Sequence, residues 1–525
     1  MNSPARGMIQ PYELGPGPHL FTDWRYVRPG QVRWEGATGQ DVSLFATEGE
    51  PDFVQAVALD VPSGIRLVAQ PAQRIGPVLR PTRPWERTFG PSCLMLEGGK
   101  YRLWCEGLPD DYWKNPTPGM GTTLDTGWGN LLSYFESDDL EHWTRPDLHI
   151  LDYDGAPTNI LYGGPLSPKT GYHGGGVFVD PSAPPAERYK VIYMGRIDPA
   201  EMNRHEARLG KADTMARYYK SAMFGAVSPD GLHWTALPDP IMLANSDTGN
   251  TAYYDPALGK YVGYFRMWFY GRRAVGRAET DDFSRWPLPE PILWPGPEHP
   301  AEVDLYTNAH TLYPGTNDQH LIFPAWYRRA TDTTEVHLAS SQEGRLWSPI
   351  PSGPILATAD DGAWDGGCLF VAKGLVPYGA DHVAAAYVGY SVPHKYPRSM
   401  VLGDVGLAVW QAERLVALQA DEIGQFTTPP LIFQGRELQL NLLTARAGYG
   451  RVEVAAAEDP IRPVPTKAGA AFEGFSFADA DPLWGDRQRA TVTWKGQSDM
   501  SALAGKPIVL RFRLSAAKLF AFSFT

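Results

Sequence analysis

Carboxylates at the starts of predicted strands are the residues of this chain best suited to acid–base chemistry. Asp247 and Asp304 each precede a strand-like run, and Glu86 follows a tryptophan at the entrance to an earlier run. One carboxylic acid can protonate a leaving oxygen while another carboxylate attacks or activates water, so we predict these three as catalytic. Glu106 and Asp365 are reserve acids, predicted to bind substrate. The alternative is structural, because Asp often caps a turn and Glu often pairs with Arg.

Other polar and aromatic residues lie at the same end of the predicted strands as these acids. They stand at the start of the first strand or at the end of the second strand of a strand pair, and we expect both places to meet at one rim of the fold. Arg266 could hold a ligand hydroxyl or lower the pKa of a neighbouring carboxyl group through its charge. Histidines could transfer protons, although a single His near a strand is more often a structural residue. The remaining predicted binding residues are Arg87, His173, Arg196, Asn250, Arg266, Tyr306, Asn308, His310, Trp326, Trp364, Tyr390 and His394.

A heptapeptide that ends in Trp recurs along the chain and indicates what positions these residues. Its copies are SDDLEHW at 137–143, SPDGLHW at 228–234, TDDFSRW at 280–286 and SQEGRLW at 341–347. The first hydroxyl and the acid at the third position can satisfy turn amides, so each copy predicts a tight hairpin with the Trp as an apolar anchor. We therefore exclude the acids of these turns from the site: Asp139, Asp230, Asp282 and Glu343.

Pairs of strand-like runs precede each heptapeptide, as in SCLMLEGGKYRLWCEG before the first copy. A fifth pair, GGCLFVAKGLVPYGADHVAAAYVGY, is followed by DVGLAVW without a clear heptapeptide. Units of this kind bury their faces by stacking around an axis. The predicted fold is all-β, with a five-bladed β-propeller at 81–415 and a C-terminal β-sandwich at 416–525, where apolar and polar residues alternate. Residues 1–80 have sparse strand-like runs and are predicted to pack on the propeller.

Composition agrees with a β-rich globular protein. The 525 residues include 54 Gly and 48 Pro without a collagen-like period, which indicates many turns and short strands. A formal net charge of −12 without a basic cluster gives no electrostatic basis for binding nucleic acid. Because no signal-peptide core and no apolar run of about 18 residues is visible, we predict a soluble, cytoplasmic protein that does not partner a membrane.

Cysteines and aromatic residues add two weaker indications. Cys93, Cys105 and Cys368 lack the paired spacing of a zinc site and are predicted to be buried apolar residues. No closely spaced His pair with a carboxylate is present, so the residues predict no metal site. Aromatic residues make up 12% of the chain. Their flat faces could stack on sugar rings, although large β-proteins also use them for packing.

With the repeated units in place, the chain resembles the glycosidase superfamily of five-bladed propellers that includes glycoside hydrolase families 32, 43, 62, 68 and 130. The phrases RPWE, TNILYGG, DPSAPPAERYK, DTGNTAYYD, VDLYTNA and LFAFSFT are similar to those of a bacterial group labelled family 32-like. The chain departs from family 32 itself, since Gly90 stands where the nucleophilic Asp would fall and DTGN replaces the acid motif. Its carboxylates are therefore expected at other positions.

The resemblance implies a glycoside hydrolase that acts on an oligosaccharide or glycoside, exo-acting on a terminal sugar. It favours a furanoside, such as an arabinofuranoside or fructofuranoside. One alternative is a phosphorylase or transglycosylase, in which Arg87, Arg196 and Arg266 could bind phosphate; another is a carbohydrate-binding propeller without catalysis. The superfamily leaves room for a Ca²⁺ ion in the channel, and no other cofactor is expected. Homo-oligomer formation is left open.

Overall fold

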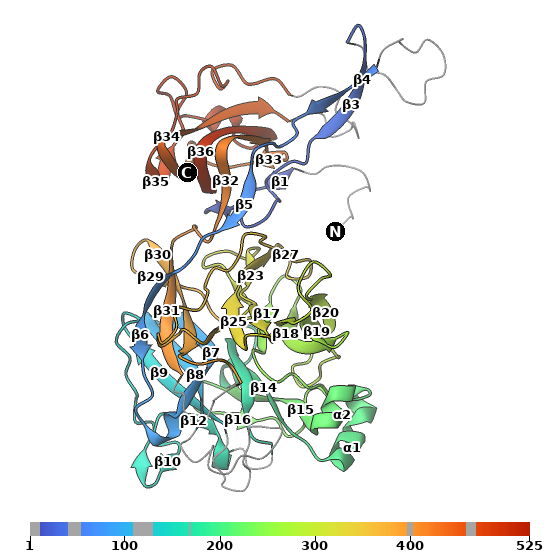
Figure 1. The fold of residues 1–525 in the computed structure, drawn as a ribbon, viewed down its shortest axis with the longest axis vertical. Coiled ribbons are helices and arrows are strands. Elements are labelled where there is room, and N and C mark those ends of the chain that lie inside the picture. Colours follow the sequence, from blue (N-terminus) through green and yellow to red (C-terminus); the bar gives the residue numbers. More distant parts are fainter. Residues whose placement is uncertain (1–10, 40–53, 109–129, 167–169, 396–402, 458–468) are drawn as a thin grey trace. The chain divides into compact units, whose positions relative to one another are not determined.

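The computed structural model describes residues 11–39, 54–108, 130–166, 170–395, 403–457 and 469–525, which are almost entirely β-structure (Figure 1). The chain divides into two compact units. The predicted boundary at 415 lies close to this division, but the residues before 71 belong with the C-terminal segment. Unit 1 contains residues 1–70, 350–352 and 413–525, and unit 2 contains residues 71–349 and 353–412.

Unit 2 begins with three antiparallel sheets in which consecutive strands are neighbours. The order is β7–β8–β9–β12 in the first sheet, β13–β14–β15–β16 in the second and β17–β18–β19–β20 in the third. Their bounds are β7 (Thr88–Glu97), β8 (Lys100–Leu108), β9 (Leu131–Ser137), β12 (Ile160–Gly163), β13 (His173–Val179), β14 (Tyr189–Arg196), β15 (Ser221–Ser228), β16 (Thr235–Ala236), β17 (Thr251–Asp255), β18 (Lys260–Phe269), β19 (Arg272–Thr280) and β20 (Glu290–Leu293).

The fourth repeat is interrupted, so its strands form two short sheets. Their orders are β21–β24–β25 and β22–β23–β26–β27. The connection between β21 and β22 contains Ala309, whose φ of 44° places the backbone in the left-handed region. The bounds are β21 (Val303–Leu305), β22 (Thr311–Leu312), β23 (His320–Ile322), β24 (Ala325–Arg328), β25 (Thr333–Val336), β26 (Ala339–Ser341) and β27 (Ser348–Pro349).

The last sheet of unit 2 takes its outer strand from the N-terminal side of the chain. Its order is β28–β30–β31–β6, with β29 paired to β30. Val405 of β31 pairs with Leu79 of β6, and Val409 pairs with Gln73. The segment 1–80, predicted to pack on the propeller, therefore supplies the outer strand of a sheet in unit 2. The bounds are β6 (Gln73–Leu79), β28 (Cys368–Val371), β29 (Val376–Tyr378), β30 (His382–Tyr390) and β31 (Asp404–Gln411).

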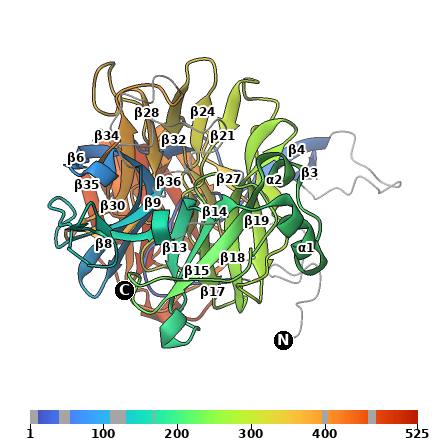
Figure 2. The same ribbon diagram turned by 90° about the horizontal axis from the view of Figure 1, so that it is seen from below.

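Apolar clusters join each sheet to the next and the last sheet to the first. In the cluster that joins last to first, Leu79 of β6 and Leu407 of β31 pack with Phe89 of β7. The fourth repeat packs on the last sheet through Tyr306 and Phe370. Figure 2 shows the sheets following one another in chain order around a common centre. Burying both faces of each sheet in this way explains the nearly continuous apolar pattern of the inner strands.

The four heptapeptides form the turns that the sequence predicts. Asp139 Oδ1 accepts hydrogen bonds from the amides of Glu141 and His142 at 2.9 and 2.8 Å. Asp230 repeats this pattern in the second copy. Along the chain, the Trp that ends each heptapeptide follows the third strand of its sheet and precedes the outer strand. These are the equivalent positions predicted for Trp143, Trp234, Trp286 and Trp347.

Two helices interrupt unit 2 between β14 and β15. They are α1 (Pro199–Leu209) and α2 (Thr214–Tyr219), whose N-termini are capped by Asp198 and Asp213. Within the described ranges no helix has the length and apolar character needed to span a bilayer. The three predicted apolar cysteines, Cys93, Cys105 and Cys368, are buried and free, as expected.

Unit 1 contains an eight-stranded sheet built from both ends of the chain. Strand β36 pairs with β32, β33, β34 and β2, and β5 pairs with β32. A separate hairpin is formed by β3 (Gln31–Gly36) and β4 (Val54–Leu59). The sheet strands are β1 (Tyr12–Glu13), β2 (His19–Leu20), β5 (Arg66–Ala69), β32 (Val416–Thr427), β33 (Leu431–Ile432), β34 (Leu438–Ala456), β35 (Asp486–Thr491) and β36 (Ile508–Phe524).

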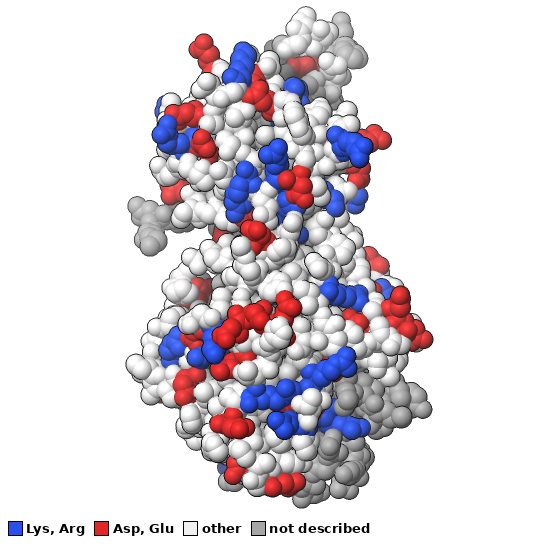
Figure 3. Space-filling model, turned by 90° about the vertical axis from the view of Figure 1, so that its left-hand side faces the viewer, with Lys and Arg blue, Asp and Glu red and all other residues white. Residues whose placement is uncertain are grey.

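Charged side chains of both signs are interspersed on the face of each unit that Figure 3 draws. In unit 2 a group of Lys and Arg side chains gathers on this face, with acidic side chains near it.

Candidate functional site

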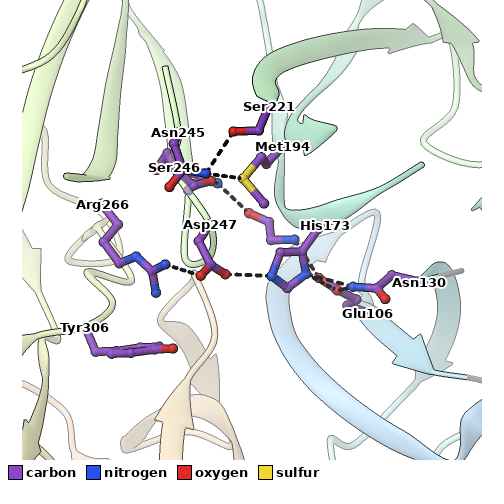
Figure 4. A network of polar contacts seen from close by, with 12 residues as sticks. Glu106, Asn130, His173, Met194, Ser221, Asn245, Ser246, Asp247, Arg266 and Tyr306 are labelled. Atoms are coloured by element: carbon purple, nitrogen blue, oxygen red, sulfur yellow. Dashed lines mark hydrogen bonds and ion pairs between the residues drawn. The ribbon is translucent and has the colours of Figure 1, made fainter. Parts of the chain in front are cut away.

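A line of hydrogen bonds joins two carboxylates through one imidazole ring in unit 2 (Figure 4). Nδ1 of His173 lies 2.6 Å from Oε1 of Glu106, and Nε2 lies 2.8 Å from Oδ1 of Asp247. Glu106 comes from β8, His173 begins β13, and Asp247 precedes β17. Both ring nitrogens thus face carboxylate oxygens, which accept hydrogen bonds only, so the ring is a double donor in its imidazolium form.

The glycine after His173 lets the loops approach closely enough to form this line. Gly174 has a φ of 60°, and a Cβ at this position would collide with the carbonyl of Asp247. Its amide donates a 2.6 Å hydrogen bond to Oε2 of Glu106. The side-chain amide of Asn130, immediately before β9, donates to Oε1 of the same carboxylate. Glu106 is therefore fixed by donors on both oxygens.

Two buried asparagines hold the loop that carries Asp247. Asn250 Nδ2 donates to the carbonyls of Gly174 and Ser246, each at 2.9 Å. Asn308 Nδ2 donates to the carbonyl of Gly249 at 2.6 Å. Both asparagines were predicted to bind substrate, but their amides are occupied by the backbone. The structure gives them a positioning role instead.

Arg266 and Tyr306 lie on the far side of Asp247 from His173 (Figure 4). Arg266, in β18, forms an ion pair with Oδ2 of Asp247. Its guanidinium carbon lies 4.6 Å from the ring centroid of Tyr306, and that of Arg273 lies 4.9 Å from the same centroid. Stacking of this kind fixes the plane of a guanidinium group and so the direction of its donors.

Charges within the site separate the protonation states of its members. Burial opposes the charge of His173, but Glu106 and Asp247 outweigh it and raise the pKa of the imidazole to about 10. Burial likewise opposes ionisation of Asp247, yet Arg266 and His173 hold the pKa of this carboxyl well below its usual range. Near neutral pH the site thus holds an ionised aspartate beside a protonated histidine.

Solvent reaches this site from the side of His173 and Asp247. The exposed fractions of their side chains are 31% and 37%, against 8% for Glu106. A ligand can therefore contact the edge of the imidazole ring and the carboxylate of Asp247. Glu106 lies behind them and is suited to orienting His173.

Two of the three predicted catalytic acids lie in other ion pairs, which revises their expected role. Asp304 has no exposed side-chain surface and is bound by Arg273 at 2.7 Å and by Arg329 at 2.9 Å. Glu86 is also fully buried and is held by Arg145 at 2.9 Å. With their oxygens occupied by cations, both carboxylates stabilise the fold and are not available to a substrate.

Most of the other predicted binding residues pack against partners within their own sheets or the next. His310 Nε2 lies 3.1 Å from His320, and its ring stacks on Tyr264 with centroids 4.2 Å apart. Trp326 stacks on His337 at 3.8 Å. These rings belong to the packing between strands, so the structure does not bring them to Asp247.

The last sheet holds four further predicted residues, three of which are engaged within it or on β7. Trp364 stacks on Tyr387 with centroids 5.4 Å apart, and Asp365 accepts from the hydroxyl of Tyr387 at 2.8 Å. The hydroxyl of Tyr390 donates to the carbonyl of Phe89 at 2.5 Å. His394 differs, because its ring packs against Tyr306 of the candidate site, with the two ring centroids 4.8 Å apart.

The two remaining predicted arginines lie at strand ends. Arg87 follows a 3₁₀ turn and its amide donates to the carbonyl of Leu108. Arg196 ends β14 and pairs with Ser221. The side chain of Arg266, the third arginine predicted to bind phosphate, forms an ion pair with Asp247.

Sequence reasoning missed several residues that contact the site. Asn130 and Arg273 were not predicted, nor was Lys395, whose ammonium lies 5.6 Å from the ring centroid of Tyr306. Asn130 carried a usable signal, because it is a polar residue at the very start of a predicted strand.

Comparisons with known proteins give similarity in solved structures only. No family model and no curated protein matches the sequence. An N-acetylgalactosamine deacetylase from F. plautii, in complex with blood group B trisaccharide, is 12% identical, with 67% of this chain and 97% of that chain covered and a TM-score of 0.43. A glycosyl hydrolase from Bacteroides ovatus is 14% identical, with coverages of 66% and 95% and a TM-score of 0.42.

A third similar structure represents the family 130 of mannoside phosphorylases, described as containing glycoside hydrolases that target β-1,2 mannosidic linkages in Candida mannan. It is 15% identical, with 66% of this chain and 94% of that chain covered and a TM-score of 0.42. The narrower family 32-like label stays a prediction.

Proposed function

We propose that unit 2 is a five-bladed β-propeller whose central site cleaves a glycosidic bond, and that unit 1 is an accessory β-sandwich. The succession of sheets supports the propeller, because each packs on the next and the last packs on the first. The strand β6 completes the last sheet from the opposite end of the unit. Such closure leaves few exposed strand edges.

The observation that carries the proposed chemistry is the line Glu106–His173–Asp247–Arg266. Asp247, kept ionised by Arg266, is the base that activates water. His173 is the acid, because it is protonated, exposed along one edge and oriented by Glu106 in the way a buried carboxylate orients a catalytic histidine. A glycosidic oxygen would take the place of Asp247 as the acceptor at Nε2. The proton then moves to the leaving oxygen while water attacks the sugar carbon.

The positions of the two carboxylates give them different proposed roles. Hydrogen bonds of 2.6 and 2.8 Å and a whole imidazole ring separate Glu106 from Asp247. Glu106 thus lies behind His173, so Asp247 is the carboxylate left to activate water at the sugar carbon. We therefore propose a single displacement with Asp247 as base.

The resemblance supplies the remaining details of the proposal: exo attack on a terminal sugar and preference for a furanoside. Phosphorolysis is less well supported, since Arg266 is already paired with Asp247. A binding module without catalysis would not need an ionised aspartate beside a protonated histidine.

A substrate screen tests this function. Aryl furanosides and pyranosides, then oligosaccharides, are incubated with the wild-type protein with and without phosphate, and the released sugar is followed by NMR to assign its anomeric form. We expect phosphate-independent release with inversion, lost in Asp247→Asn and retained in Asp230→Asn. Turnover that survives in Asp247→Asn would refute the assignment, and turnover that requires phosphate would convert it to a phosphorylase.

A further inference from the structure

Lys373 is a lysine whose side chain lies among the inner strands of unit 2. It follows β28, and its backbone pairs with β7: its amide donates to the carbonyl of Ser92 at 3.0 Å, and its carbonyl accepts from Leu94 at 2.7 Å. Among the residues that the structure describes, no Asp or Glu lies within ion-pair distance of its ammonium. Its partners are of another kind.

The ammonium of Lys373 reaches two other inner strands and binds their carbonyl oxygens. Nζ donates to the carbonyl of Val177 in β13 at 3.2 Å and to that of Ala252 in β17 at 2.5 Å. It also lies 5.3 Å from the ring centroid of Phe178. Carbonyl oxygens and an aromatic face are the surroundings of a bound cation, whereas a salt bridge would supply a carboxylate.

The two strands that Lys373 joins are those that present the acid and the base. His173 begins β13, four residues before Val177, and Asp247 lies five residues before Ala252. The 2.8 Å contact between Nε2 of His173 and Oδ1 of Asp247 depends on how β13 and β17 lie relative to one another. A cation that binds carbonyl groups of both strands therefore helps to set the distance between His173 and Asp247.

Two titratable side chains near Lys373, those of Cys93 and His310, are neutral near pH 7. Burial raises the pKa of the Cys93 thiol to about 11, against the opposing effect of Lys373. Burial also lowers the pKa of His310 well below its usual range, and Lys373 contributes to that lowering. Burial lowers the pKa of Lys373 itself to about 8. The ammonium thus costs free energy where it stands, so its contribution lies in geometry more than in stability.

We propose that the ammonium of Lys373 is the resident cation at the centre of unit 2, filling the place that a channel Ca²⁺ would take and fixing the spacing of His173 and Asp247. Ca²⁺ does not fit the residues present, because it needs six to eight oxygen ligands, usually including carboxylates. Here the carbonyls of Val177 and Ala252 already bind a positive charge. Lys373 is a positioning residue and does not itself touch the reacting atoms.

Substitution and chemical rescue test this inference without any substrate, so its failure is distinct from failure of the proposed function. Lys373→Ala removes three carbons and the ammonium, which together are n-propylammonium. We expect n-propylammonium chloride to raise the Tm of Lys373→Ala in a saturable way and to leave the wild-type Tm unchanged. 1-Propanol has the same shape without the charge and should not replace it. Equal effects of the amine and the alcohol would overturn the proposal.

The positioning role is read from His173 in protein labelled with ¹⁵N-histidine, with the signal assigned by its loss in His173→Gln. Lys373→Met should lower the pKa of His173, since the contact with Asp247 loosens, and Lys373→Arg should restore it in part. Lys190→Met is the matched control, because Lys190 is a buried lysine of the same unit that pairs with Asp180 at 3.4 Å. It should leave the His173 signal in place. An unchanged His173 pKa in Lys373→Met would sink the idea.

The wild-type protein provides a measurement that does not depend on whether a variant folds. If Lys373 is the resident cation, neither EDTA nor millimolar CaCl₂ shifts the Tm of the wild-type protein. A Tm that falls in EDTA and returns with Ca²⁺ would show a resident metal ion and refute the proposal.

Discussion

Nε2 of His173 and Oδ1 of Asp247 lie 2.8 Å apart, and this contact joins the second sheet of unit 2 to the third. The contact pairs a protonated ring with an ionised carboxylate whose other oxygen is held by Arg266. The contact therefore brings an acid and a base together, two roles that usually need two carboxyl groups of different pKa. Four predictions follow from the environments of these and neighbouring residues.

Asp247→Asn should reduce turnover by about 10²–10⁴-fold while preserving the fold, because an amide can neither activate water nor hold the imidazolium. The matched control is Asp230→Asn, a turn residue that accepts from the amides of Leu232 and His233. Its turnover should stay near the wild-type value. Steady-state rates on the substrate found by screening, with circular dichroism of both variants, provide the measurement. Equal rates for the two variants would contradict the assignment.

Asp304→Asn should instead destabilise the protein, by about 3 kcal/mol, because it leaves the buried ends of Arg273 and Arg329 without their carboxylate. The direction of the pKa agrees: burial raises it, but the two arginines outweigh burial and lower it. Denaturant unfolding should show the loss. A stable Asp304→Asn with turnover reduced as far as in Asp247→Asn would restore Asp304 to the catalytic set.

His173 should make the stability of unit 2 depend on alkaline pH. Its pKa is raised from 6.5 to about 10 in the folded protein, so its contribution is fully present below 6.5 and is lost as pH rises through 10. Lys373 contributes with opposite sign above about 8, since its pKa is lowered. Lys373 is present in both the wild-type protein and His173→Gln, so its effect cancels in the difference between their unfolding free energies. A difference in unfolding free energy that does not change from pH 6 to 10 would show that His173 is not protonated as described.

Buried histidines should limit stability on the acid side. Burial lowers the pKa of His320 from 6.5 to about 4, and it also lowers the pKa of the neighbouring His310 well below its usual range. Their contribution is therefore complete above 6.5 and is lost as pH falls toward 4, where the unfolded chain binds the protons that the folded one excludes. His320→Gln should flatten the fall of Tm between pH 6.5 and 4. An unaltered slope would rule out His320 as its source.

Sequence reasoning succeeded where local chemistry decides the structure. The turn role of Asp139 and the equivalent places of the four Trp residues follow from side chains and amides a few positions apart. The position of Asp247 before a strand could also be predicted, while its catalytic role stays a prediction. What the sequence could not show were partners from distant segments: Glu86 looks like Asp247 in sequence, and only the fold brings Arg145 to it.

The same limit explains the N-terminal segment. Strands β5 and β6 are separated by a few residues, yet β5 pairs with β32 in unit 1 and β6 pairs with β31 in unit 2. Short strand-like runs carry no record of which sheet they will join, since pairing depends on residues hundreds of positions away. Because these short runs do not show which strands they pair with, the sequence predicts only that residues 1–80 pack on the propeller.

The pairing of β6 with β31 and of β2 with β36 has a consequence for synthesis of the protein. Each unit needs strands from both of its own ends, so unit 2 cannot be completed before β31 is made, and unit 1 cannot be completed before β36 is made. Contacts of such long sequence separation slow folding and leave early strands unpaired in the meantime. Nascent chains should therefore depend on chaperones, and truncation near residue 80 or 415 should yield aggregates in place of isolated domains.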